Sequence, residues 1–328
     1  MNKVETDTLS TMTSSFRIAH ISDTHVSPEY NRHNVVKLKN LLAYVVDEQF
    51  DHIAITGDIT GDGEYGGYRS VRRLLKYFDL LDYDRLSVTI GNHDIFGGVH
   101  RAEDLFTFGN RCRTRDYEAQ VRLFERSFKE TFPKKAYKGE SLFPYVKIVG
   151  PVALIGINSI SRFHAIWNPV GSNGRIEDNQ LEEVERILLH PSIAELKKIV
   201  LIHHHFNKYR PLSDSLGTTL YHRFEAQTLK LYGKNRVEEL FNKSGVDAVL
   251  HGHTHIEGVY SRSGMMFSSA ALNPVRDRVD IDEPATDTEL LFNEISVSSE
   301  GTIVVSRRRA SVHHKGTSSQ AIDQKHYS

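Results

Sequence analysis

This 328-residue sequence has only one cysteine and no long apolar segment. The single cysteine, Cys112, excludes an internal disulfide and favours a reducing compartment. No run approaches the roughly 20 consecutive apolar residues that a membrane-spanning helix needs. Residues 1–15 form a polar leader without the apolar segment of a secretory signal. We therefore expect a cytoplasmic protein, with peripheral contact at the inner membrane left open.

An excess of charge of either sign is also lacking. The formal net charge is −1, and charged residues make up 25% of the chain. Such a chain has no strong overall field to attract nucleic acid or an anionic lipid surface. We accordingly expect no nucleic-acid binding. Nothing in the sequence indicates an oligomeric state.

Several short apolar runs end abruptly in side chains that can bind metal ions. The run 53–56 is followed at once by Gly57 and Asp58. Four more runs show the same pattern: 16–21 leads into Asp23 and His25, 86–90 into Asn92, His93 and Asp94, 199–202 into His203, His204 and His205, and 247–250 into His251, His253 and His255. In open α/β folds, ligands bind at the carboxyl ends of buried strands. The pattern therefore predicts one site built from five strand ends.

The order of the expected elements indicates an α/β fold. Apolar residues recur at helical spacing between the strands 16–21, 52–56 and 86–90, which predicts a βαβαβ opening with a parallel sheet. Residues 95–142 interrupt this alternation, and we interpret them as an insertion that overhangs the site. The remaining predicted elements are helices 34–46, 117–132, 178–189 and 234–243 and strands 143–149, 152–157, 199–202, 247–250, 258–260, 264–270, 290–297 and 302–306. One domain would span 16–306, and the polar residues 307–328 are predicted to be disordered.

The residue types at the strand ends suit a metal that activates water. Such a metal takes carboxylate, imidazole and amide oxygen ligands, with open positions left for water and substrate. Asp23 and His25 are two residues apart, so both point the same way on an extended segment, and His253 and His255 share this spacing. A histidine taken alone is more often structural. Five clusters in the same position favour a metal site, with Asp58 as its shared centre.

The motifs Asp-x-His, Gly-Asp, Gly-Asn-His-Asp, a strand-end histidine and Gly-His-x-His occur in that order over residues 16–270. They resemble the calcineurin-like metallophosphoesterase superfamily, and in particular its bacterial cyclic-nucleotide phosphodiesterases. The resemblance implies a four-layer α/β/β/α sandwich of two mixed sheets with helices outside. Residues 16–306 would then be a metallophosphoesterase domain, and two divalent or trivalent ions of manganese, iron or zinc would lie at one sheet edge.

The resemblance also assigns ligands to the two ions. The first would take Asp23, His25, Asp58 and His255, and the second would take Asp58, Asn92, His203 and His253. Asp58 bridges the two ions in this scheme. His203 is preferred to His204 because it directly follows the apolar run. The family often has proline soon after this histidine, where His205-Phe206 stands here.

A reaction follows from the same resemblance. Two ions ~3.5–4 Å apart deprotonate a shared water, and the metal-bridging hydroxide attacks phosphorus in line. The family histidine that matches His93 faces the scissile phosphate, where it stabilises charge or protonates the leaving oxygen. Asp94 could orient the His93 ring, as carboxylates do for other catalytic imidazoles.

Three functions are compatible with these motifs. The favoured one is hydrolysis of a small, cyclic-nucleotide-like phosphodiester, because residues 57–63 and 91–94 lack the arginine and glutamate of the superfamily's serine/threonine phosphatases. The second is a pyrophosphatase that cleaves a nucleotide diphosphate, UDP-2,3-diacylglucosamine, in lipid A biosynthesis, with peripheral membrane contact. The third is a metal-binding scaffold without catalytic activity.

Other residues bear on the choice of substrate. Apolar side chains of the insertion could line an acyl-binding cap, although a small core beneath the insertion is the stronger interpretation: Phe96, Leu105, Phe106, Phe108, Phe124 and Phe128. Basic residues that could grip a phosphate, or simply face solvent, are Arg101, Arg111, Arg113, Arg115 and the segment 208–210. His164 and Trp167 could contact substrate, whereas His20, His52 and His100 are expected to be structural. Asn158 could support the site or form a turn.

Overall fold

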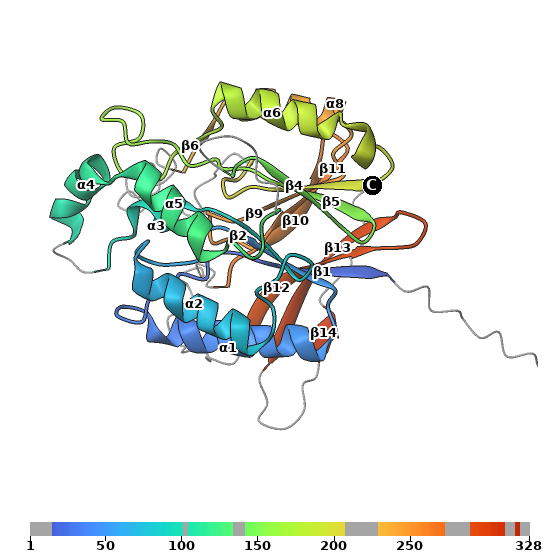
Figure 1. Ribbon diagram of the computed structural model, residues 1–328, viewed down its shortest axis with the longest axis horizontal. Coiled ribbons are helices and arrows are strands. Elements are labelled where there is room, and N and C mark those ends of the chain that lie inside the picture. The colour runs from blue at the N-terminus through green and yellow to red at the C-terminus, as the bar shows by residue number, and fades with distance from the viewer. Residues whose placement is uncertain are drawn as a thin grey trace, which may run out of the picture.

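The computed structural model describes residues 15–100, 104–133, 142–206, 229–272, 289–311 and 319–321. Two six-stranded sheets lie face to face, with helices on their outer sides (Figure 1). The first sheet has the order β14 (Ser319–Ala321), β13 (Ile303–Ser311), β12 (Glu289–Val297), β1 (Phe16–Ile21), β2 (His52–Thr56) and β3 (Leu86–Thr89). The second has the order β10 (Gly258–Arg262), β11 (Met265–Ser269), β9 (Ala248–His251), β7 (Lys197–Leu201), β5 (Val152–Gly156) and β4 (Tyr145–Val149). The predicted four-layer α/β/β/α sandwich is confirmed.

Helices cover each sheet from outside (Figure 1). The first sheet is covered by α1 (Arg32–Asp47) and α2 (Tyr65–Tyr77), and the second by α6 (Asp178–Leu188) and α8 (Lys234–Lys243). The other described elements are α3 (Asn92–Phe96), α4 (Asp104–Thr114), α5 (Tyr117–Ser127), the 3₁₀ turn η1 (Pro191–Ile193) and a small sheet of β6 (Gly174–Arg175) and β8 (Leu231–Tyr232). Within the described ranges, no helix combines the length and apolar character that crossing a bilayer requires.

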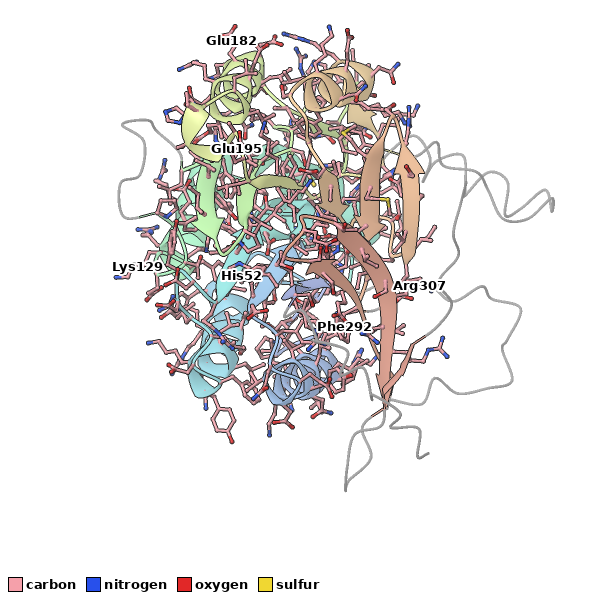
Figure 2. The ribbon with its side chains drawn as sticks, turned by 90° about the vertical axis from the view of Figure 1, so that its right-hand side faces the viewer. His52, Lys129, Glu182, Glu195, Phe292 and Arg307 are labelled. Carbon is pink, nitrogen blue, oxygen red and sulfur yellow. The ribbon has the colours of Figure 1, made fainter. Side chains whose placement is uncertain are left out.

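The core follows from the alternation of side chains along the strands. On β2, Ile53 and Ile55 face the helix layer, whereas Ala54 faces the other sheet. Phe292 of β12 extends the same outer core by packing its ring 5.8 Å from Tyr44 and 5.7 Å from Phe50 (Figure 2). Both faces of each sheet are therefore buried, which explains why the strands read as nearly continuous apolar runs.

Parallel pairing brings the predicted ligand-bearing strand ends to one edge. In the first sheet β1 pairs with β2 and β2 with β3, all parallel. In the second sheet β5, β7 and β9 are also parallel neighbours. The chain segments that leave β1, β2, β3, β7 and β9 therefore emerge together.

Two predicted boundaries were wrong. The helix predicted over 117–132 ends at Ser127, and turns follow it before Pro133. The tail predicted to be disordered from residue 307 instead continues β13 to Ser311 and includes β14. Residues 312–318 and 322–328 lie outside the described part of the chain.

The polar strand β13 is held by its ladder and by ion pairs. Its residues pair with β12 throughout the register from Ile303↔Val297 to Ser311↔Glu289. Arg307 lies 2.8 Å from Glu257, and Arg308 lies 2.5 Å from Glu294 (Figure 2 labels Arg307 on this strand). These interactions do not depend on apolar periodicity, which is why the pattern-based prediction missed them.

The insertion 95–142 contributes core as well as surface. Helix α5 packs against α2 and α3, and Phe96, Phe124 and Phe128 are fully buried in the outer core of the first sheet. Phe106 of α4, in contrast, is 91% exposed. Residues 101–103 and 134–141 are not among those described.

One lysine is buried between the insertion and the sheets. Lys147 of β4 is 1% exposed, and its Nζ donates to the carbonyls of Leu86 and Thr131 at 2.7 and 3.0 Å. Its ammonium also lies 4.5 Å from the centre of the Tyr83 ring. Burial lowers the pKa of Lys147 to about 7, although Asp84 and Asp82 act in the opposite direction. Lys147 thereby joins β3, β4 and the end of the insertion.

Candidate metal centre

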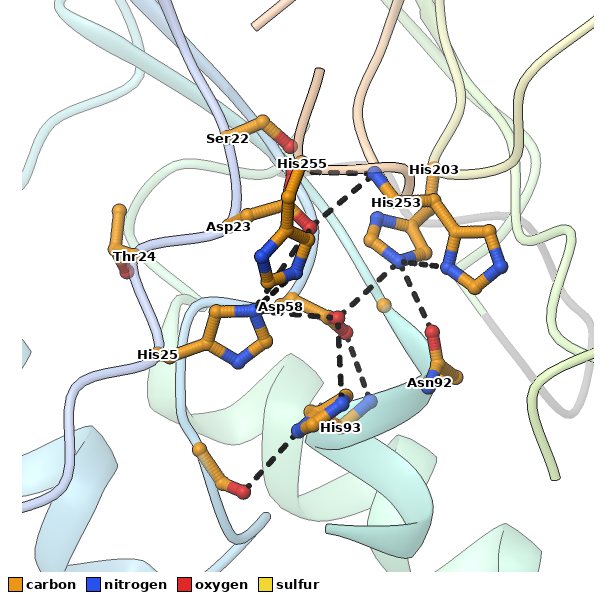
Figure 3. Close-up of polar contacts among 12 residues, drawn as sticks. Ser22, Asp23, Thr24, His25, Asp58, Asn92, His93, His203, His253 and His255 are labelled. Carbon is orange, nitrogen blue, oxygen red and sulfur yellow. Dashed lines mark hydrogen bonds and ion pairs between the residues drawn. The ribbon is translucent and has the colours of Figure 1, made fainter. Parts of the chain in front are cut away.

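All seven side chains predicted to bind metal lie at the shared edge of the two sheets (Figure 3). Those that follow β1, β2 and β3 are Asp23, His25, Asp58 and Asn92. Those that follow β7 and β9 are His203, His253 and His255. Each sheet thus supplies part of the site, and the site lies across the seam between them.

The first group consists of Asp23, His25, Asp58 and His255, whose ligand atoms all lie within 4.8 Å of one another. The Nε2 atoms of His25 and His255 are 2.9 Å apart. An Asp23 oxygen lies 3.6 Å from His255 Nε2, and an Asp58 oxygen lies 3.8 Å from His25 Nε2. Two imidazole nitrogens and two carboxylates converging on one point form a donor set that suits a divalent metal.

The second group consists of Asp58, His203 and His253, again within 4.8 Å. His203 Nε2 lies 3.4 Å from Asp58 Oδ2 and 3.1 Å from His253 Nδ1. The amide oxygen of Asn92 lies 3.1 Å from the same His203 nitrogen. Asp58 belongs to both groups, so the arrangement has the shape of two adjacent sites with one shared carboxylate.

The contacts of the three consecutive histidines distinguish their roles. His203 Nδ1 donates to the Thr56 carbonyl at 2.8 Å, so Nε2 is the ring nitrogen that faces the other ligands. His204 is directed elsewhere, with Nδ1 2.8 Å from Ser159 Oγ and Nε2 3.1 Å from the Ser172 carbonyl. His205 Nε2 contacts the Leu229 carbonyl at 3.0 Å. The geometry therefore favours His203 as the ligand and gives its two neighbours structural contacts.

Backbone strain is concentrated at the ligands. Positive φ angles occur at Asp23, His25, Asp58, His253 and His255, with values from 41° to 75°. Non-glycine residues rarely adopt such angles, and clusters of them are typical of functional sites. The strain turns each side chain out of the strand direction and toward the common centre.

Glycines at the strand ends make room for the ligands. A Cβ on Gly57 would lie 2.5 Å from the ring nitrogen of His203, and one on Gly252 would lie 2.4 Å from an Asp23 oxygen. A Cβ on Gly91 would lie 2.2 Å from an Asp58 oxygen. These distances are shorter than real contacts allow, so the Gly-Asp, Gly-Asn and Gly-His pairs in the sequence are steric requirements of the site.

The protonation states fit cation binding. Burial lowers the pKa values of His25 and His253 well below the usual range, which keeps both imidazoles neutral. Burial alone would raise the pKa of Asp58, but His203, His93 and His25 outweigh it and lower that pKa well below its usual value. For His203 burial has the opposite effect and lowers the pKa, yet the Asp58 and Asp23 carboxylates raise this pKa to about 9. The carboxylates thus draw positive charge to this centre, and the residues present fit a pair of metal ions.

His93 lies beside the two groups without belonging to either. Its Nε2 is 4.0 Å from Asp58 Oδ2, and its ring is 27% exposed. Its Nδ1 is 3.3 Å from the Gly61 carbonyl. The ring is thereby held with Nε2 toward the metal centre and with an accessible edge (Figure 3).

The predicted role of Asp94 is wrong. Its carboxylate accepts hydrogen bonds from the backbone N–H groups of Ile59, Thr60 and Gly91 at 3.2, 2.9 and 3.0 Å. Within the described part of the chain, the Asp94 carboxylate makes no hydrogen bond with the His93 ring. Asp94 is fully buried and ties the loop after β2 to the start of α3. The group that accepts from His93 is the Gly61 carbonyl, which a reading of side-chain types could not reveal.

The other residues of interest have mostly structural contacts. Arg115 binds Glu64 and the Asp62 carbonyl, Arg111 binds the Gly98 carbonyl, and Arg113 binds Asn110. His20 and His52 are buried and bonded within the sheets, as expected. Asn158 is bonded to Gln180 and Tyr117, and His164 and Trp167 stack on each other beside a separate cavity. Arg101, the side chain of Leu105 and residues 208–210 lie outside the described residues.

Comparisons with known proteins agree with this architecture. The yellow lupin (Lupinus luteus) purple acid phosphatase PPD1 superposes with a TM-score of 0.56 at 12% identity, covering 90% of this chain and 52% of that one. A dimetal phosphatase from Danio rerio superposes with a TM-score of 0.52 at 11% identity, covering 88% and 98%. At these identities the likeness shows the fold alone, and the chain spans about half the length of the lupin phosphatase.

The sequence itself gives a more specific result. No curated protein matches it significantly. The family model described as calcineurin-like phosphoesterase, however, matches residues 16–257, which include every predicted metal ligand. A match over most of the chain, on this fold and with this constellation of ligands, makes the chain a member of the calcineurin-like phosphoesterase family.

Proposed function

We propose that this chain is a dinuclear-metal phosphoesterase that hydrolyses a small phosphodiester. The observation that carries the proposal is that two ligand groups share Asp58. The partly exposed ring of His93 lies beside them, with its Nε2 4.0 Å from Asp58 Oδ2. Two bound ions of manganese, iron or zinc would supply a nucleophile from water and neutralise the oxygens of the reacting phosphoryl group. The chain's own residues then position the ions and assist the leaving group.

Each residue has a distinct part in this scheme. Asp58 would be shared by the two ions, Asp23, His25 and His255 would hold the first, and Asn92, His203 and His253 would hold the second. His93 faces the reacting centre through Nε2, while its Nδ1–H donates to the Gly61 carbonyl. Burial lowers the pKa of His93, and the Asp58 carboxylate and the Gly61 carbonyl act in the opposite direction. When protonated, the ring can stabilise charge on the phosphoryl group or donate a proton to the leaving oxygen.

A diester is favoured over a phosphoprotein by the loop after β2. Where the serine/threonine phosphatases of the superfamily carry an arginine, this chain carries Asp62. Its carboxylate accepts from Ser27 Oγ at 2.9 Å and from the Glu64 N–H at 3.0 Å. An acidic side chain at this position does not attract a phosphomonoester dianion, whereas a diester carries one negative charge fewer.

The UDP-diacylglucosamine alternative loses its main support. Phe96, Phe124 and Phe128, which could have lined an acyl-binding cap, are buried in the core. Phe106, in contrast, is 91% exposed, so only part of the expected acyl-binding cap lies in the core. A small diester and a cytoplasmic location remain our proposal, the location resting on the single cysteine.

One assay separates the alternatives. The purified chain is incubated with manganese and, in parallel, with bis-p-nitrophenyl phosphate, cyclic nucleotides and UDP-2,3-diacylglucosamine. We expect hydrolysis of the small diesters, its loss on treatment with EDTA, and no turnover by the Asp58→Ala variant. Preferred cleavage of the acylated nucleotide would reverse the choice of substrate. Two bound ions per chain without any turnover would show a metal-binding scaffold.

A further inference from the structure

The carbonyl oxygen of Gly61 is the meeting point of three N–H donors. The backbone N–H of Gly98 donates at 3.0 Å, His100 Nε2 at 2.9 Å and His93 Nδ1 at 3.3 Å. Gly98 and His100 both belong to the segment that follows α3, at the start of the insertion. One backbone oxygen therefore connects the insertion to the ring that faces the metal centre.

The contacts with this oxygen determine which ring nitrogen of His93 and of His100 carries a hydrogen. A carbonyl can only accept, so both ring nitrogens in contact with it must carry hydrogen. Nδ1 of His93 therefore carries a hydrogen, while Nε2 faces Asp58. His100 has its hydrogen on Nε2.

The Gly61 carbonyl needs external support to keep its direction. Gly61 has no side chain, and Gly63 two residues later has a φ of +65°, so this part of the loop has unusual conformational freedom. The N–H of Gly61 bonds to the Val26 carbonyl at 3.2 Å, which holds only one side of the residue. The shorter bonds from Gly98 and His100 are those that hold the carbonyl itself.

His100 is well placed to provide this support. Its ring stacks on Tyr30 with centres 4.5 Å apart and planes 3° from parallel. Its backbone N–H donates to Asp104 Oδ2 at 2.9 Å. Tyr30 lies in the loop that also carries Asp23 and His25, so the stack joins this loop to the insertion.

We propose that His100 is a positioning residue for His93, acting through the Gly61 carbonyl. The inference rests on the proposed function, because it gives His93 a task at the leaving group. The donor of His100 keeps the carbonyl aimed at His93 Nδ1, and the carbonyl keeps His93 Nε2 aimed at the metal centre. The insertion thus contributes to the reaction through a backbone oxygen, without touching the substrate.

Two variants of the full chain test this arrangement. His100→Phe keeps a flat ring against Tyr30 but removes the donor, whereas His100→Gln retains an N–H near the position of Nε2. The tautomer of His93 is read by ¹H–¹⁵N NMR of the zinc-loaded and metal-free chains, with its signal assigned by comparison with His93→Ala. The kcat is measured with bis-p-nitrophenyl phosphate, which has a good leaving group, and with diphenyl phosphate, which has a poor one.

We expect the His93 signal of His100→Phe to show both tautomers and that of His100→Gln to keep one. For diphenyl phosphate we expect kcat of His100→Phe to fall about three- to tenfold, the scale of one lost hydrogen bond. Bis-p-nitrophenyl phosphate, which needs little protonation, should lose less than about twofold by the same reasoning. His100→Gln should match the wild type with both substrates.

An unchanged His93 tautomer in His100→Phe overturns the proposal, as do equal kcat losses for the two variants or the two substrates. Failure of the proposed function has a different signature, namely a wild-type chain that is inert toward both diesters. The NMR result still decides the role of His100 in that case, because it requires no turnover.

Discussion

The backbone N–H of His93 donates to Oδ1 of Asp58 at 2.7 Å. The other oxygen of Asp58 is left to face both ligand groups, 3.8 Å from His25 and 3.4 Å from His203. The two carboxylate oxygens therefore differ in their surroundings: the chain fixes one, and the other points to where both ions would lie. The start of α3 thereby positions the carboxylate of Asp58 as well as the imidazole of His93.

Replacing Asp58 should remove both metal ions. Asp58 is the ligand common to the two groups, so Asp58→Ala opens both sites at once. We expect elemental analysis of manganese-incubated protein to fall from two ions per chain to nearly none. Asp178→Ala is the control, because that carboxylate is 61% exposed on α6. Two ions retained by Asp58→Ala would exclude the bridging role.

Replacing His93 should separate metal binding from turnover. Its ring belongs to neither ligand group, so His93→Ala should keep both ions. We expect kcat to fall by about 10²–10⁴, the usual contribution of a general acid. His190→Ala, on the surface near η1, should behave as the wild type. Loss of the ions from His93→Ala would show that this imidazole is a ligand instead.

A methyl group at Gly252 should disrupt the site sterically. The added Cβ would lie 1.9 Å from Ser22 Oγ and 2.4 Å from Asp23 Oδ2, so Ser22 and Asp23 must shift. We expect Gly252→Ala to lose about 1–3 kcal/mol of unfolding free energy, as overpacked interiors do, and to bind fewer ions.

The matched control for that variant is Gly66→Ala. Gly66 lies in α2, and a Cβ there would meet no atom within 4 Å. We expect a gain of about 0.5–1 kcal/mol, since alanine is a better helix former than glycine. Urea unfolding of both variants gives the comparison. Equal stability of the two would contradict the close packing at Gly252.

The buried Lys147 should make stability depend on pH above neutrality. Its pKa is lowered to about 7 in the folded chain from 10.5, because burial disfavours the ammonium. Between these values the unfolded chain holds a proton that the folded chain has released, so the free energy of unfolding rises with pH.

Lys147→Met, which lacks the titrating group, is the reference for that effect. Urea unfolding of both proteins at pH 7 and pH 9 should show the wild type gaining stability relative to the variant as the pH rises. Parallel pH profiles would mean that the lysine keeps its usual pKa despite its burial.

Much of the site could be predicted because each ligand lies within five residues of the end of an apolar run. Strand ends are visible in a sequence, and the parallel topology then determines that Asp23, Asp58 and His203 meet. His203 was preferred to His204 because it directly follows the apolar run, and its contacts with Asp58, Asn92 and His253 agree with that preference.

The contacts that orient the catalytic groups could not be predicted in this way. The acceptors for His203 and His93 are the carbonyls of Thr56 and Gly61, and every residue has a carbonyl, so residue type carries no signal. Asp94 was misinterpreted for the same reason, because its partners are backbone N–H groups. The extension of β13 was missed because pairing and ion pairs, rather than apolar spacing, hold it.

The left-handed backbone at Asp23, His25, Asp58, His253 and His255 affects how cations would be captured. Since folding of the sandwich imposes these unfavourable angles, the fold itself sets the arrangement of the ligands. Capture should then require little rearrangement of the polypeptide, and affinity should depend mainly on exchanging hydration water for protein donors. Chelation should accordingly leave the loops near their original paths, ready to be reloaded.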